Sequence, residues 1–205
     1  PVAPAPVFEM LDLKFVDWPG HGLPDETPWQ YVETDWGPLD ATEEEYGGDW
    51  SVSQWIGEKL RSPQDQPFFL AVGFWKPHLP FNAPKRYWDL YEPAEITLPP
   101  NPEAPRSVPD IALHDGRELL GAFPDGLTEE QVHTLRHGYY AATSFVDAQV
   151  GTVLDELDRL GLGERTIVVF WSDHGFHLGP DGSRIGFIGS SLDTEVDLVP
   201  SPVAQ

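Results

Sequence analysis

Apolar residues between Thr128 and about Leu160 recur at steps of three and four positions. This spacing predicts one long amphipathic helix with a single apolar stripe. Thr128 and Gln131 have the spacing of a capping box, in which each side chain bonds the backbone N–H of the other residue. Gly161 follows the last apolar position and is typical of a helix end. We therefore expect a helix of about nine turns in the second half of the chain.

Two short apolar runs have the composition of buried strands. Phe68–Phe74 and Thr166–Trp171 are continuous, rich in β-branched and aromatic residues, and bounded by turn residues. A helix is predicted before each of them, the first from Asp49 or Ser51 to about Arg61, with either residue as its cap. Alternating helices and buried strands indicate an α/β fold with a mostly parallel sheet and right-handed crossovers.

Composition narrows the classes of partner. The chain carries 12 basic and 34 acidic residues, a net charge of −22, which disfavours nucleic acid and anionic membranes. It has no cysteine, so disulfides and thiolate metal sites are excluded. No apolar run approaches the ~20 residues of a membrane span, and residues 1–6 lack the basic start of a signal segment. Residues 1–48 and 92–126 are rich in proline and are expected to be irregular.

Asp173, His174 and Gly175 follow directly on the second predicted strand. In open α/β sheets this edge binds ligands, so a carboxylate and an imidazole there are candidate metal ligands. The turn that Gly175 permits could bring both side chains to one ion, with His177 nearby. The alternative is an aspartate that caps the next turn beside a surface histidine.

Lys76 and His78 follow the first predicted strand in the same way. Pro77 and Pro80 frame them and rule out a continuing helix or a central strand. Prolines also lower the entropy of the loop, as a preorganised anion site requires. The alternative is a tight loop with two solvent-facing polar residues.

His133 and His137 share one helix face at a spacing that can bind zinc. No HExxH sequence accompanies them, so we interpret both as part of a solvated or loop-packed face.

Four stretches together resemble the sulfatase family of the alkaline phosphatase superfamily, in particular its iduronate-2-sulfatase-like members. They occur in the family's order and spacing and span roughly residues 35–179. These stretches are Pro67–Phe81, Tyr87–Tyr91 with Ile96–Pro99, Tyr139–Gly151 and Ser172–Gly179.

The resemblance implies part of an alkaline-phosphatase-like α/β sandwich that hydrolyses sulfate esters of sugars or related substrates. Asp173 and His174 would bind a divalent cation, usually calcium in this family, although an imidazole suits zinc or manganese better. His78, and with less support Lys76, would contact the sulfate or the leaving oxygen as catalytic residues. The family's nucleophile is a formylglycine made from a C/S-x-P-x-R motif.

That motif is missing from the 205 residues, as is the Asp-Asp pair that supplies two further metal ligands in the family. We therefore expect an internal fragment, incomplete at both ends and inactive by itself. Residues 1–179 would be the partial catalytic domain, and residues 180–205 a tail that matches nothing. The resemblance also implies an extracytoplasmic location. Two alternatives remain open: a phosphoester or phosphonate hydrolase of the same superfamily, and a non-catalytic acidic binding module.

Overall fold

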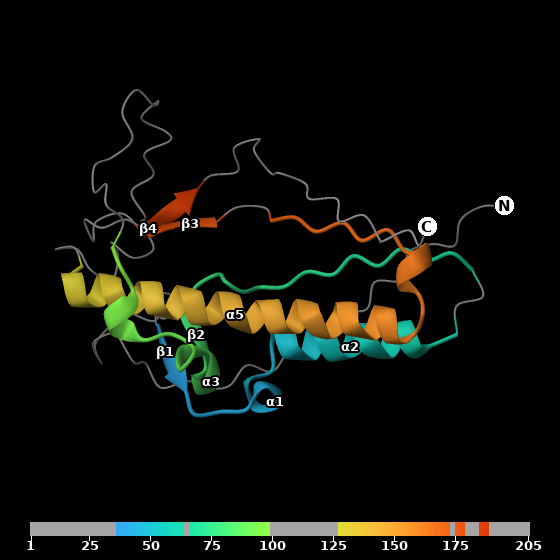
Figure 1. Ribbon diagram of the computed structural model, residues 1–205, viewed down its shortest axis with the longest axis horizontal. Coiled ribbons are helices and arrows are strands. Elements are labelled where there is room, and N and C mark those ends of the chain that lie inside the picture. Colours follow the sequence, from blue (N-terminus) through green and yellow to red (C-terminus); the bar gives the residue numbers. More distant parts are fainter. Residues whose placement is uncertain (1–35, 64–65, 99–126, 173–174, 179–184, 189–205) are drawn as a thin grey trace, which may run out of the picture.

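The computed structural model describes residues 36–63, 66–98, 127–172, 175–178 and 185–188. A single long helix, α5, runs through it, and the other elements lie along this helix (Figure 1). The elements in chain order are β1 (Trp36–Leu39), α1 (Glu43–Tyr46), α2 (Asp49–Arg61), β2 (Phe81–Pro84), α3 (Lys85–Trp88), the 3-10 turn η2 (Pro93–Glu95), α5 (Glu129–Arg159), the 3-10 turn η4 (Gly163–Arg165), β3 (Gly175–Leu178) and β4 (Ile185–Ile188).

The long predicted helix is confirmed as α5. Its capping box is present: the Gln131 N–H donates to Thr128 Oγ1 at 3.2 Å, and the Thr128 N–H donates to Gln131 Oε1 at 2.8 Å. The chain leaves the helix after Leu160, where Gly161 adopts φ +65°, a backbone conformation that suits glycine. The apolar face is buried at Val132, Leu135 and Phe145, whereas Leu154, expected on the same stripe, is exposed.

The helix predicted up to Arg61 is confirmed as α2, but its start differs from the expectation. Gly48 occupies the cap position and makes no side-chain cap bond. Neither Asp49 nor Ser51 caps the helix, because Asp49 lies within the first turn and bonds a distant loop instead. The helix packs on α5, where Ser53 Oγ lies 3.0 Å from Gln149 Oε1.

Parallel strand pairing is present, but not in the segments where we expected it. β1 pairs in parallel with β2, with Trp36 opposite Phe81, and α2 lies in the crossover between them. A second, antiparallel pair joins β3 to β4. The helix and strand content is therefore that of an α/β fold with an open parallel sheet, as expected.

Phe68–Phe74 and Thr166–Trp171 do not form the buried strands that we predicted. Apart from a single bridge at Phe170, both run without strand pairing, as long traces in Figure 1. Phe69 is 88% exposed and Ile167 is 87% exposed. Both segments have the right composition for strands, but a strand needs a neighbour to take its backbone hydrogen bonds. The described residues place no such neighbour along most of either segment.

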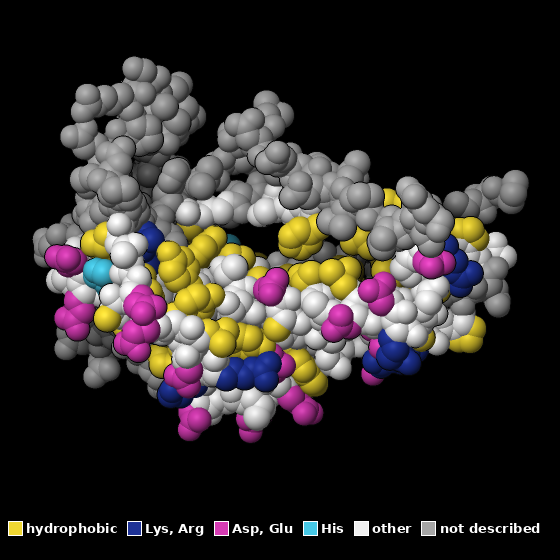
Figure 2. Space-filling view, in the orientation of Figure 1, with side chains coloured by type: hydrophobic (Ala, Val, Ile, Leu, Met, Phe, Trp, Pro, Cys, Tyr) yellow, Lys and Arg dark blue, Asp and Glu magenta, His cyan; other side chains and the backbone are white. Residues whose placement is uncertain are grey.

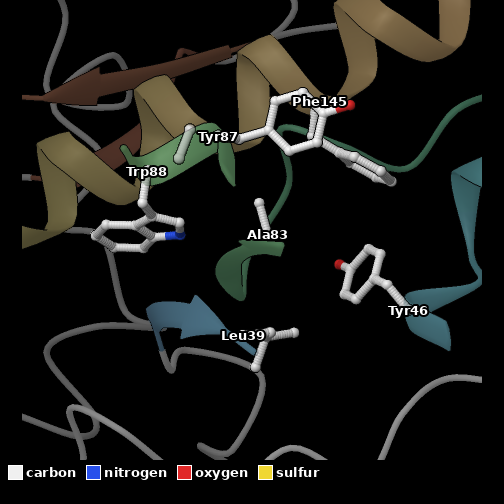
Figure 3. Close-up of a cluster of buried hydrophobic side chains, with 7 residues drawn as sticks. Leu39, Tyr46, Ala83, Tyr87, Trp88 and Phe145 are labelled. Atoms are coloured by element: carbon white, nitrogen blue, oxygen red, sulfur yellow. The ribbon is translucent and has the colours of Figure 1, made fainter. Parts of the chain in front are cut away.

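A hydrophobic core lies between α5, β1, β2 and the short helices α1 and α3. Figure 3 shows side chains from all five elements pointing into one space. Phe145 meets the ring of Tyr46 edge to face at 5.1 Å between centroids, and that of Tyr87 at 5.4 Å. This core holds β2, and the loop that precedes it, against α5.

Gly138 allows β2 to approach the α5 backbone. A Cβ at this position would lie 2.7 Å from the Phe81 carbonyl oxygen and 3.0 Å from the Trp88 ring. Both neighbours are buried, so neither can move aside without disturbing the core.

None of the helices in the described part of the chain is long and apolar enough to cross a membrane.

We expect Gly138→Ala to lower the free energy of unfolding by about 1–2 kcal/mol, because the clash outweighs the gain in helix propensity. Gly151→Ala is the matched control, since α5 leaves open space around Gly151, and it should be neutral or stabilising by up to about 1 kcal/mol. Urea unfolding of both variants tests this. Equal effects of the two substitutions would contradict the close packing of β2 on α5.

Candidate functional site

The loop that carries Lys76 and His78 is fixed to α2 by one buried carboxylate. Asp49 Oδ1 accepts the Trp75 N–H at 2.7 Å, and Asp49 Oδ2 accepts the Lys76 N–H at 2.8 Å. Burial raises the pKa of Asp49, while these two backbone bonds and the nearby Lys76 ammonium act in the opposite direction. Two charge-assisted bonds on adjacent amides define where the loop begins.

Lys76 is buried under the loop, with 6% of its surface exposed. Its Nζ donates to the Pro80 carbonyl and, at 3.0 Å, to Asn82 Oδ1. The same Asn82 oxygen accepts the Tyr46 hydroxyl at 2.9 Å. Burial lowers the pKa of Lys76 to about 7, although the charge of Asp49 opposes that shift. In this geometry the Lys76 ammonium ties both ends of its own loop together.

His78 lies half-buried at the tip of the loop. Its backbone N–H donates to the Trp75 carbonyl at 3.0 Å, and its Nδ1 lies 2.8 Å from the Leu79 carbonyl oxygen. A carbonyl can only accept, so Nδ1 carries a proton, and in the neutral ring Nε2 holds the lone pair. The Trp75 ring covers one side of the imidazole, with 4.6 Å between centroids. The peptide bonds before Pro77 and Pro80 are both cis.

Phe176 brings the second candidate segment to this loop. The ring of Phe176, in β3, lies 5.9 Å from that of His78 and 5.2 Å from that of Phe81. Asp173 and His174 lie outside the described residues, and Gly175 and His177 belong to β3. The two loops that the sequence singled out, 90 or more positions apart, therefore meet at His78 and Phe176.

His137 and His133 take no part in this arrangement. His137 Nε2 lies 2.8 Å from the Trp88 carbonyl oxygen, and its ring packs on that of Trp88 at 4.6 Å. His137 thus packs against Trp88 at the end of helix α3, where we expected a solvated or loop-packed face.

The described part of the chain contains no group of three or more histidine, aspartate and glutamate side chains that could hold a metal ion. Asp49, the buried carboxylate nearest to the loop, already uses both oxygens for backbone N–H groups. This part of the chain does not by itself fit a divalent cation.

Sequence reasoning missed Asp49, Asn82 and Tyr46. The position of Asp49 at a helix start suggested a cap, and nothing in its neighbours indicates a contact with residues 75 and 76. Asn82 and Tyr46 lie in segments without a recognisable pattern. Their roles depend on tertiary contacts that span up to 36 residues.

Figure 2 shows acidic side chains over much of the visible face and apolar side chains in a band along α5. The exposed large apolar side chains of the described residues are concentrated in and beside two extended segments, Phe68–Phe74 and Thr166–Trp171. The exposed large apolar residues in and beside these segments are Phe68, Phe69, Leu70, Val72, Trp75, Ile167, Val169, Phe170 and Trp171.

Comparison with known proteins identifies relatives. Residues 27–199 match the model of the family described as Sulfatase. The chain is 39% identical over 152 residues to iduronate 2-sulfatase of Mus musculus, covering 69% of the chain and 27% of that protein. It is 32% identical over 176 residues to a sulfatase of Formosa agariphila, covering 84% of the chain and 34% of that protein. The chain thus spans about a quarter to a third of the length of these relatives.

A solved structure supports the fold. A phosphonate monoester hydrolase from Silicibacter pomeroyi superposes with a TM-score of 0.50 at 23% identity, over 78% of this chain and 35% of that one. At this identity the likeness concerns the fold alone.

The buried amine of Lys76 should make stability depend on pH. In the unfolded chain its pKa returns to the ordinary 10.5, so between pH 7 and 10.5 the unfolded state holds more protons than the folded state. The free energy of unfolding should therefore rise with pH in that window, by up to about 1.4 kcal/mol per unit. Below about pH 7 the cost of burying the charged amine is fully present.

Lys76→Met removes this titration. Urea unfolding of both chains from pH 7 to 9.5, below the range where tyrosines ionise, should show a smaller slope against pH in the variant. Identical slopes would contradict a depressed pKa at Lys76.

Proposed function

The chain belongs to the sulfatase family, and we propose that it supplies one wall of an active site that hydrolyses sulfate esters of sugars or related substrates. The contact between His78 and Phe176 carries the proposal. It joins the Lys76–Pro80 loop to the segment that follows Asp173 and His174. Both segments resemble the family's sulfate- and metal-binding stretches. The substrate class also has support from the relatives, which include an ulvan-active sulfatase of Formosa agariphila.

His78 is the residue proposed to act on the ester. As an imidazolium it would stabilise or protonate the oxygen that leaves sulfur. Because Nδ1 bonds the Leu79 carbonyl, Nε2 is the ring nitrogen proposed to give its proton to the ester. The ring contacts those of Trp75 and Phe176, and these contacts limit its rotation.

Lys76 is proposed to act mainly on the loop. Its Nζ already bonds Pro80 and Asn82 and lies under the loop, not at its surface. Its charge would still raise the local positive potential that a sulfate anion meets.

Asp173 and His174 are proposed as ligands of a divalent cation, calcium by family resemblance. Such an ion would neutralise charge on the sulfate and polarise its sulfur. We propose that the further ligands and the formylglycine nucleophile lie outside the 205 residues, whose sequence has neither motif. An extracytoplasmic location is proposed by the same resemblance.

An aryl sulfate should bind the 205-residue chain weakly, with a Kd in the millimolar range, through His78. NMR titration of the histidine ring signals at pH 6 should show shifts for His78, and His78→Ala should weaken binding at least about tenfold, the effect of losing one charge-assisted bond. His133→Ala, which removes a half-buried imidazole from α5, is the matched control and should bind as the unmodified chain does.

Two other outcomes are informative. An aryl phosphonate monoester that binds more tightly than the sulfate would favour a phosphonate hydrolase instead. The absence of any His78 shift would contradict the proposal, and would favour a binding module with another ligand.

The chain alone should neither turn over an aryl sulfate nor bind calcium tightly. Two side-chain ligands are far fewer than the six to eight oxygens that calcium takes. Calorimetry with calcium should give no Kd below about 1 mM. Turnover above background, or a tight calcium site that Asp173→Asn abolishes, would show that the chain contains more of the active site than proposed.

A further inference from the structure

Asp49 contacts the His78 loop from outside it, across 26 residues of sequence. It is 4% exposed, and each of its two carboxylate oxygens accepts one backbone N–H of the loop. As a first-turn residue of α2 it could have capped the helix, but both oxygens point to the loop instead. Burying a carboxylate is costly unless it is fully hydrogen-bonded. Two backbone N–H groups of the loop supply these hydrogen bonds, so the buried carboxylate stabilises the loop.

The contacts continue from Asp49 through Trp75 to His78. The Trp75 N–H is held by Asp49, and the Trp75 carbonyl in turn accepts the His78 N–H at 3.0 Å. The indole Nε1 of Trp75 donates to the Leu79 carbonyl at 3.2 Å, the same oxygen that lies 2.8 Å from His78 Nδ1. The indole ring also covers the imidazole. Both of these hydrogen-bond contacts of His78, with Trp75 and with Leu79, are therefore made within the loop that Asp49 anchors.

We infer that Asp49 is a positioning residue for His78, acting through the backbone and side chain of Trp75. The inference rests on the proposed function for its meaning in catalysis. The two hydrogen bonds from the Trp75 and Lys76 amides to the Asp49 carboxylate, here called the clamp, can be measured without substrate. Loss of the carboxylate would release the two amides, and the imidazole would then lose its orientation and its selected tautomer.

The clamp is measured first in the unmodified 205-residue chain. Through-hydrogen-bond NMR couplings should link the Trp75 and Lys76 amide nitrogens to the Asp49 carboxylate carbon. Their absence, with the α5 amides assigned and protected, would overturn the inference even if no variant folds.

The variant Asp49→Asn keeps the shape of the side chain but has one acceptor oxygen and no charge. Hydrogen exchange at the Trp75 and Lys76 amides should speed up at least about tenfold, as expected for losing a bond to a charged group. Amides of Val132 and Phe145 on α5 should change much less. Asp155→Asn, an exposed aspartate on α5, is the control and should change neither set.

The ligand measurement separates this inference from the proposed function. With an aryl sulfate, Asp49→Asn should weaken binding about tenfold and restore part of the second His78 tautomer in ¹⁵N spectra, while Asp49→Glu should recover some affinity. If the unmodified chain binds no aryl sulfate, the proposed function fails, and the exchange and tautomer data still test the clamp. Exchange that rises equally at α5 and at the loop, or unchanged His78 signals, would overturn the positioning role.

Discussion

The contact between Phe81 and the α5 backbone at Gly138 fixes the position of most other features. Phe81 is fully buried and belongs to β2, the strand that follows the His78 loop directly. Its ring meets those of Tyr139 and Phe176 edge to face, at 5.4 and 5.2 Å. One side chain thus joins the parallel strand pair, the long helix and the segment after Asp173 and His174. This junction holds the candidate site in place, because the His78 loop leads directly into β2 and Phe176 packs on Phe81.

Local sequence signals predicted the helices well. The capping box at Thr128 and the three- and four-residue apolar spacing depend only on neighbours within one or two turns, and α5 forms where they indicate. The strands were predicted less well, because their formation depends on partners far away in the chain. Thr166–Trp171 has a strand composition, yet it is largely exposed where no described strand lies beside it, and the pairing occurs instead in the short Phe81–Pro84 segment.

The site was predicted in part. Prolines around Lys76 and His78 indicated a preorganised loop, and the loop is indeed held by several bonds. The sequence also indicated a second segment with candidate metal ligands after Thr166–Trp171. The contact between the rings of Phe176 and His78 brings that segment to the loop. Asp49 could not be predicted, since its contacts depend on how α2 lies against the loop. The roles of Asp173 and His174 remain predictions.

We propose that the His78 loop and the β3 segment form one binding surface for a sulfate ester. Intermolecular NOEs from the ring protons of a bound aryl sulfate test it most directly. Cross-peaks to both the His78 imidazole and the Phe176 ring are predicted, with none to His133. Cross-peaks confined to other residues, or to only one of the two rings, would contradict it.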